Sequence, residues 1–146
     1  MQTQLKKISA LLLTLLLVLS LVACGGNVDS KGTATVVVGE TAYTVNLSDV
    51  AEDGKGLLGV LDVLKEKENL TFTAENGFLT QVGDLKQDSA AGIYLFLYTS
   101  VEKDADVSQY ATKTEWNGNS YTSSGVGAAE MTVEDGAVII IRTIKW

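Results

Sequence analysis

The segment Ile93-Tyr94-Leu95-Phe96-Leu97-Tyr98-Thr99 decides the fold, because it is the most strand-like stretch in this chain of 146 residues. Side chains alternate between the two faces of a strand. The aliphatic side chains at odd positions therefore share one face, and the aromatic side chains at even positions share the other. Because both faces are apolar, we predict that this segment is a central strand of a sheet.

The residues before this strand predict two β-hairpins. A Gly-Glu pair separates the β-rich runs 33–38 and 41–47, which is typical of a hairpin. Asn76-Gly77 separates the runs 70–75 and 78–82, and this dipeptide is a strong hairpin signal because both of its residues tolerate a positive φ. We therefore expect two pairs of antiparallel strands on the N-terminal side of the central strand.

A helix is predicted between the two hairpins. Leucines recur at positions 57, 58, 61 and 64 with charged residues between them, so the spacing predicts an amphipathic helix from about 56 to 68. Gly59 lies inside it and costs about 1 kcal/mol relative to alanine. We interpret this glycine as the mark of a close approach between the helix and the sheet.

The residues after the central strand predict a third hairpin and a last strand. An Asn-Gly-Asn turn joins the runs 113–116 and 120–122, and a strongly β-branched run occupies 137–143. The order of elements predicts an α+β domain, with one main helix packed on a mixed sheet. Trp146 ends the chain, and the sequence leaves open whether it is buried or exposed.

The first 23 residues have the pattern of a cleaved secretory signal peptide. Lys6 and Lys7 precede an apolar run at 8–22, and small residues follow it. The run has about 15 residues, whereas a transmembrane helix needs about 20. We therefore predict that residues 1–23 direct export and are then removed.

The four residues Leu21-Val22-Ala23-Cys24 resemble the bacterial lipobox. This resemblance implies cleavage before Cys24, thioether lipidation of its sulfur and acylation of the new amine. Two or more acyl chains give stable membrane anchoring. We therefore expect a lipoprotein on the extracytoplasmic face of the cell membrane. The alternative is an ordinary signal peptide followed by an unmodified cysteine.

The mature chain is expected to consist of a short tether and one domain. Residues 24–32 are rich in glycine and polar residues and predict a flexible tether, and residues 33–146 form the domain. Removal of the two lysines in residues 1–23 changes the net charge from −7 to −9. This acidity argues against nucleic acid as a partner, because phosphates need a basic surface.

The composition also argues against catalysis and metal binding. The chain has no histidine to activate a serine or threonine, and its single cysteine is the expected lipidation site. Glu102, Asp104 and Asp106 alternate, but their spacing does not match a calcium-binding loop. We interpret these carboxylates as solvated and predict no enzyme activity, no metal and no cofactor.

The order and spacing of several segments resemble a known family. The segments that carry the resemblance are Asp53–Leu61, Asn76–Val82, Ile93–Tyr98, Trp116–Gly118 and Gly127–Gly136. Together they are similar to the transcobalamin-like C-terminal domain, which occurs in bacterial surface proteins and forms the smaller domain of the animal cobalamin carriers. The resemblance covers about 33–146. It implies a β-grasp-like fold and cobalamin as a possible ligand.

The aromatic face of the central strand needs a cover, because the helix can cover only one face of the sheet. One interpretation is that the excursion 99–131 folds back and buries this face. The other is that a groove remains between the sheet and the excursion. Aromatic side chains with polar groups suit recognition sites. The candidate ligand contacts are Tyr94, Phe96, Tyr98, Trp116 and Tyr121.

Two functions follow from these patterns. The first is a non-catalytic, membrane-anchored module that binds a small molecule or a surface or transport protein, including corrinoid or nutrient capture as the resemblance implies. The second is a structural or adhesive surface protein. It would contact its partner through a sheet edge, for which 33–38 is the candidate because the run has no proline and no lysine.

Overall fold

The computed structural model describes residues 26–146 of the chain. The expected signal peptide 1–23 and the expected lipidation site Cys24 lie outside the described residues. No helix within 26–146 combines the length and the apolar character that a membrane span requires.

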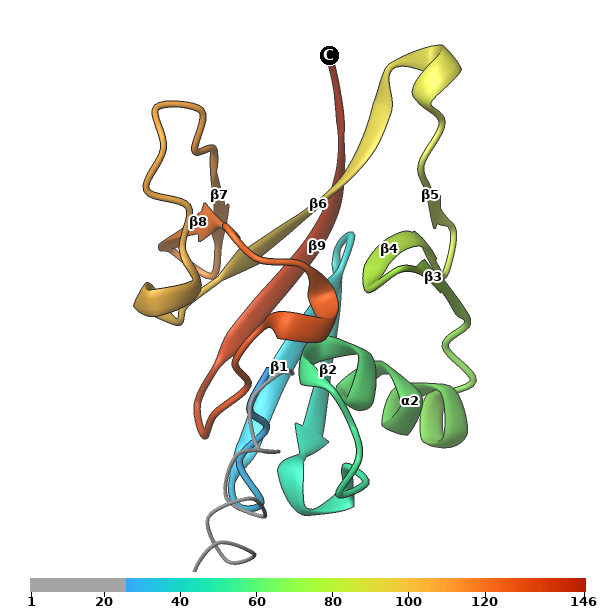
Figure 1. Ribbon diagram of the computed structural model, residues 1–146, viewed down its shortest axis with the longest axis vertical. Coiled ribbons are helices and arrows are strands. Elements are labelled where there is room, and N and C mark those ends of the chain that lie inside the picture. The colour runs from blue at the N-terminus through green and yellow to red at the C-terminus, as the bar shows by residue number, and fades with distance from the viewer. Residues whose placement is uncertain (1–25) are drawn as a thin grey trace, which may run out of the picture.

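The described chain is an α+β fold with one main helix and two sheets (Figure 1). A six-stranded sheet has the spatial order β2-β1-β9-β6-β8-β7, and a three-stranded sheet has the order β3-β4-β5. Strands β1 and β9 are parallel and the other neighbours in the large sheet are antiparallel, so this sheet is mixed, as predicted.

The strands and helices have the following bounds. The strands of the large sheet are β1 (Thr33–Val38), β2 (Thr41–Asn46), β6 (Ile93–Thr99), β7 (Lys113–Trp116), β8 (Asn119–Ser123) and β9 (Val138–Lys145). The small sheet contains β3 (Phe72–Glu75), β4 (Phe78–Val82) and β5 (Leu85–Lys86). The helices are α2 (Gly56–Glu68) and the 3-10 turns η2 (Leu47–Asp49), η3 (Ser89–Ala91), η4 (Glu102–Asp104) and η5 (Ala128–Glu130).

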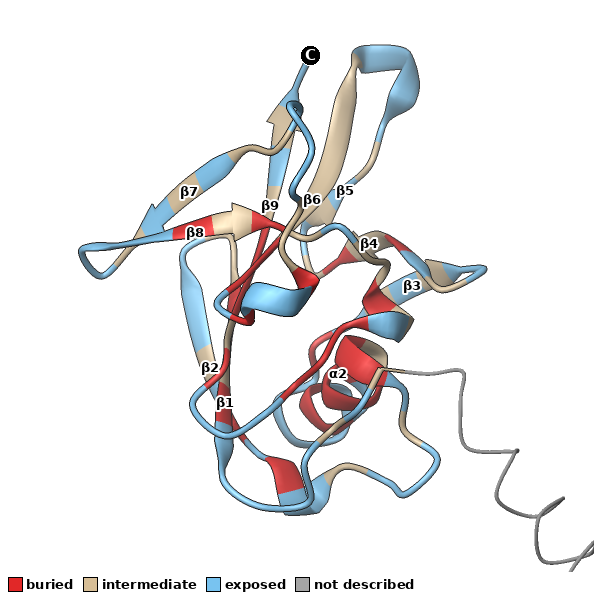
Figure 2. Cartoon of the chain, turned by 60° about the vertical axis from the view of Figure 1, so that its left-hand side comes forward, coloured by how far each residue is buried: buried red, intermediate tan, exposed pale blue. Residues whose placement is uncertain are grey.

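The larger core lies between α2 and one face of the large sheet (Figure 2). Leu57, Leu61 and Leu64 of α2 are at most 2% exposed, as the helical spacing predicts. Leu95 and Leu97 of β6 pack against this core. The aliphatic face of this strand therefore lies on the side of the larger core.

A smaller core lies on the opposite face of the large sheet. Tyr98 of β6 is buried there together with Val37 of β1, Ile140 of β9 and Tyr121 of β8, and Phe96 packs beside them. The β7–β8 hairpin belongs to the 99–131 excursion, and Figure 1 shows it on the side of β6 and β9 away from α2. Part of the excursion therefore folds back and covers the aromatic face.

The structure contradicts two expectations from the sequence, one about the position of β1 in the sheet and one about the neighbour of Gly59. Strand β1 is not a sheet edge, because β2 pairs with it on one side and β9 on the other. The glycine at position 59 does not approach the sheet, since a Cβ added there would lie 2.9 Å from the Cα of Gly54. The close approach is between α2 and the loop that precedes it.

The segment 26–29 is docked on the domain, although the sequence assigns it to a flexible tether. The N–H of Gly26 donates to the carbonyl of Ala129, and the N–H of Asp29 donates to the carbonyl of Val133. Val28 forms a parallel bridge with Val133 and packs against the larger core. These backbone bonds hold the segment, so the ordered domain includes residues before Thr33.

Candidate functional site

The sequence-predicted aromatic contacts divide into buried and accessible residues. Tyr98 is 3% exposed and Tyr121 is 8% exposed. The Tyr98 hydroxyl accepts a hydrogen bond from the Thr112 hydroxyl at 3.4 Å. Because the smaller core encloses both rings, we correct their assignment from ligand contacts to core residues that hold the β7–β8 hairpin on the sheet.

Tyr94, Phe96 and Trp116 remain half-buried. The Phe96 ring lies 6.3 Å from the Tyr98 ring and 6.4 Å from the Trp146 ring, measured between ring centroids. Trp146 is 73% exposed, which answers the question that the sequence left open. The aromatic residues that a ligand can reach on this face are therefore fewer than the sequence suggests.

Arg142 brings a positive charge to the aromatic face, and sequence reasoning missed it. It faces Phe96 across the β6–β9 pair. Its Nη1 donates to the Thr114 hydroxyl at 2.6 Å, and its Nη2 lies 3.6 Å from Oε1 of Glu40. The Glu40 side chain is 90% exposed, so this ion pair is worth at most about 1 kcal/mol. The Thr114 contact ties β9 to β7.

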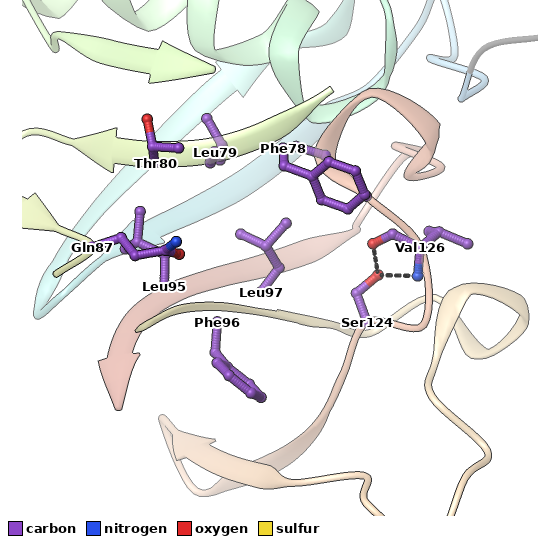
Figure 3. A pocket seen from close by; sticks show the side chains of 11 residues that line it. Phe78, Leu79, Thr80, Gln87, Leu95, Phe96, Leu97, Ser124 and Val126 are labelled. Atoms are coloured by element: carbon purple, nitrogen blue, oxygen red, sulfur yellow. Dashed lines mark hydrogen bonds between the residues drawn. The ribbon is translucent and has the colours of Figure 1, made fainter. Parts of the chain in front are cut away.

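A concave site lies on the other side of β6, between this strand and β4 (Figure 3). Its volume is about 370 Å³, which falls within the range of ligand sites, about 300–1,000 Å³. We call it the β4–β6 groove. Strand β4 contributes residues 78–80 to the lining, and strand β6 contributes residues 95–97. Gln87 and the segment 124–128 form the rest of the lining.

The lining of the β4–β6 groove is mostly apolar and contains no charged residue. Leu95 and Leu97 point to the groove side of β6, whereas the Phe96 side chain points the opposite way (Figure 3). Phe78 is 65% exposed, which makes it a large apolar surface residue at the mouth of the groove. Gln87 supplies one of the polar side chains of the groove, beside Leu95 (Figure 3). Such a lining favours an uncharged ligand.

The segment 124–128 forms one wall of the groove and is held by hydrogen bonds. The Ser124 hydroxyl donates to the Val126 carbonyl at 2.9 Å and accepts from the Val126 N–H at 3.2 Å. The Ser124 N–H donates to the Leu97 carbonyl at 2.7 Å, which fixes this wall to β6. A Cβ added at Gly127 would lie 3.3 Å from the Phe78 ring, so the wall and β4 are in contact.

Carboxylates are the candidate acid–base and metal-binding side chains within residues 26–146. Across residues 26–146, the structure brings together no group of three or more His, Cys, Asp or Glu that would hold a metal ion. Asp104 is buried, but its carboxylate accepts from the N–H and the hydroxyl of Thr132. Its interpretation as a solvated carboxylate is therefore wrong, and its role is to join two segments of the chain.

A scan against protein-family models, a search of curated proteins and a search of solved structures each found no match to this chain. We therefore infer its function from its own residues and geometry.

Proposed function

We propose that this protein is a non-catalytic binding module held on the extracytoplasmic face of the cell membrane by a lipidated Cys24. The observation that carries the binding role is the β4–β6 groove, an uncharged concavity of about 370 Å³ with an exposed aromatic ring at its mouth. Apolar concavities with a few polar groups are the usual form of ligand sites. The groove takes a small molecule or a segment of a surface or transport protein.

The position of the tether supports a site close to the membrane. The N–H of Gly26 donates a hydrogen bond to the carbonyl of Ala129. Ala128, which precedes Ala129 in the chain, lines the groove. Cys24 is two residues from Gly26, and two extended residues span about 7 Å. A lipid on Cys24 would therefore fix the groove end of the domain close to the bilayer surface.

The arrangement of the elements supports the family resemblance. The β1–β2 hairpin is followed by α2, and β9 lies parallel to β1 in the middle of the large sheet. We propose on this basis that the domain is β-grasp-like and related to the transcobalamin-like C-terminal domain. Cobalamin is the first small molecule to test, and it enters through the resemblance alone.

Melting temperatures of the full-length chain carrying Cys24→Ser test the groove. We expect a bound small molecule to raise the melting temperature, by the linkage between ligand binding and folding. Gln87→Glu should abolish the increase, because it places an unpaired carboxylate in an uncharged groove. The isosteric control is Gln109→Glu in an exposed loop, which should keep the increase.

Cobalamin is tested in the same assay and by quenching of tryptophan fluorescence. A cobalamin effect that Gln87→Glu leaves unchanged would place binding outside the groove. The absence of stabilisation by cobalamin and by a panel of uncharged small molecules would contradict small-molecule capture and leave a protein segment as the ligand.

A further inference from the structure

One edge of β6 is only partly paired. The other edge pairs with β9 along the whole strand, from Ile93 to Thr99. On the free side, β8 pairs only with Tyr98 and Thr99. Earlier in the strand, Ile93 exchanges two backbone hydrogen bonds with Asp88, and the Leu97 carbonyl accepts from the N–H of Ser124.

The alternation of a strand shows which backbone groups face this free edge. Residues two apart direct their N–H and C=O groups to the same side. Because Ile93 and Leu97 bond to residues outside β9, Leu95 also faces away from β9. Within the described residues 26–146, the N–H and C=O of Leu95 and the N–H of Leu97 have no hydrogen-bond partner.

The two residues that carry these unpaired groups line the β4–β6 groove. Leu95 and Leu97 lie side by side on the groove side of β6 (Figure 3), and the backbone bonds of Asp88 and Ser124 close the free edge at its two ends. Four residue steps separate Ile93 from Leu97, and a strand rises about 3.4 Å per residue, so the open interval is about 14 Å long. Native proteins usually pair or cover such edges.

We propose that the β4–β6 groove takes a short, extended, uncharged segment of a partner polypeptide, which adds to the free edge of β6 as a strand. A strand presents alternating N–H and C=O groups at the spacing that Leu95 and Leu97 offer. A compact small molecule does not reproduce this spacing. The apolar wall at Phe78 and the absence of charged lining residues favour an uncharged segment. The inference rests on the proposed binding role and names the partner class for that site.

The first test measures amide hydrogen exchange by NMR in the full-length chain carrying Cys24→Ser. The N–H groups of Leu95 and Leu97 face the groove, whereas those of Tyr94 and Phe96 face β9. We expect the first pair to exchange at least about 100-fold faster than the second, because exposed amides need no opening of the fold. Equal protection of both pairs would overturn the proposal, since the edge would then be closed.

The second test adds an acetylated and amidated pentapeptide of alternating threonine and valine. A short strand makes few contacts, so we expect half-saturation at about 1 mM, which corresponds to weak binding. Bound peptide should protect the Leu95 and Leu97 amides from exchange. The matched control peptide has N-methyl groups on the edge that pairs, and it should not bind because it cannot donate.

Two variants localise the binding. Phe78→Ala removes the exposed ring at the mouth of the groove and should weaken binding, and Gln87→Glu should weaken it about tenfold or more. Gln109→Glu is the control with the same charge change in an exposed loop. Phe78 and Gln87 are not in the larger or the smaller core, so both variants are expected to fold.

The outcomes separate this inference from the proposed function. If the N-methylated peptide binds as well as the unmodified one, or Leu95 and Leu97 stay unprotected, strand addition is wrong while the groove remains a binding site. If neither peptide binds but an uncharged small molecule does, the partner class is wrong. Concentration-dependent dimerisation that protects the same two amides would assign the edge to a second copy of the chain and would overturn the assignment to a partner polypeptide.

Discussion

Asp104 determines how the long excursion is attached to the domain. It lies in η4, is 7% exposed, and its carboxylate accepts from the backbone N–H of Thr132, 28 residues further along the chain. Its own carbonyl accepts from the N–H of Gly125 at 2.8 Å. One residue therefore joins the start of the excursion to the groove wall and to the segment before β9.

We predict that Asp104→Ala destabilises the fold by about 1–3 kcal/mol, because it leaves the buried N–H of Thr132 without an acceptor. Asp104→Asn keeps an acceptor and should recover part of the loss. The measurement is the free energy of unfolding in urea. Glu102→Ala, an exposed carboxylate two residues away, is the control and should change stability by less than about 0.5 kcal/mol. Equal effects at the two positions would contradict the assignment.

At the scale of elements, the β7–β8 hairpin is the cover of the aromatic face. Its backbone pairs with β6 only at Tyr98 and Thr99. Side chains also hold the hairpin, since Tyr121 is buried in the smaller core and Thr114 accepts from Arg142. The attachment of this element therefore combines a short backbone pairing with a few packed side chains.

Replacement of the Tyr121 side chain should release this cover. We predict that Tyr121→Ala lowers the free energy of unfolding by about 3 kcal/mol, the usual cost of removing a buried aromatic ring. The matched control is Tyr110→Ala, because Tyr110 is 73% exposed. Fluorescence of a hydrophobic dye should also increase for Tyr121→Ala, since the aromatic face becomes accessible. An unchanged stability would show that the hairpin contributes little to the cover.

At the scale of the whole molecule, the docked segment 26–29 connects the fold to its expected anchor. The bonds of Gly26 and Asp29 to the backbone of the 129–133 region leave little free chain between Cys24 and the domain. If Cys24 carries a lipid, the domain is held close to the membrane in a restricted orientation.

The anchor is tested by the variant Cys24→Ser. We predict that this change moves the protein from the membrane fraction to the medium, because the serine cannot form the thioether that carries the lipid. Cell fractionation measures the distribution, and mass spectrometry of the membrane-extracted chain measures the added acyl mass. Ser30→Ala is the control and should stay in the membrane fraction. A Cys24→Ser protein that remains in the membrane would contradict lipidation.

The local sequence determined most of the elements of this fold. The Asn-Gly turns fixed two hairpins, the leucine spacing fixed α2, and the alternation of β6 fixed which of its side chains share a face. These features depend on contacts or backbone preferences within a few residues. The alternation placed Leu95 and Leu97 on one face of β6, and the packing of the chain put that face, half-buried, against the larger core.

Tertiary structure alone decided where a ligand could bind. The β4–β6 groove joins Phe78, Leu95 and Ser124, residues that are far apart in the chain and carry no shared motif. The burial of Tyr98 and Tyr121, and the free edge beside Leu95, depend on where the excursion crosses β6. Hydrophobic periodicity shows that a face is apolar, but it does not show which distant segment covers that face, because covering it is a property of the packed chain.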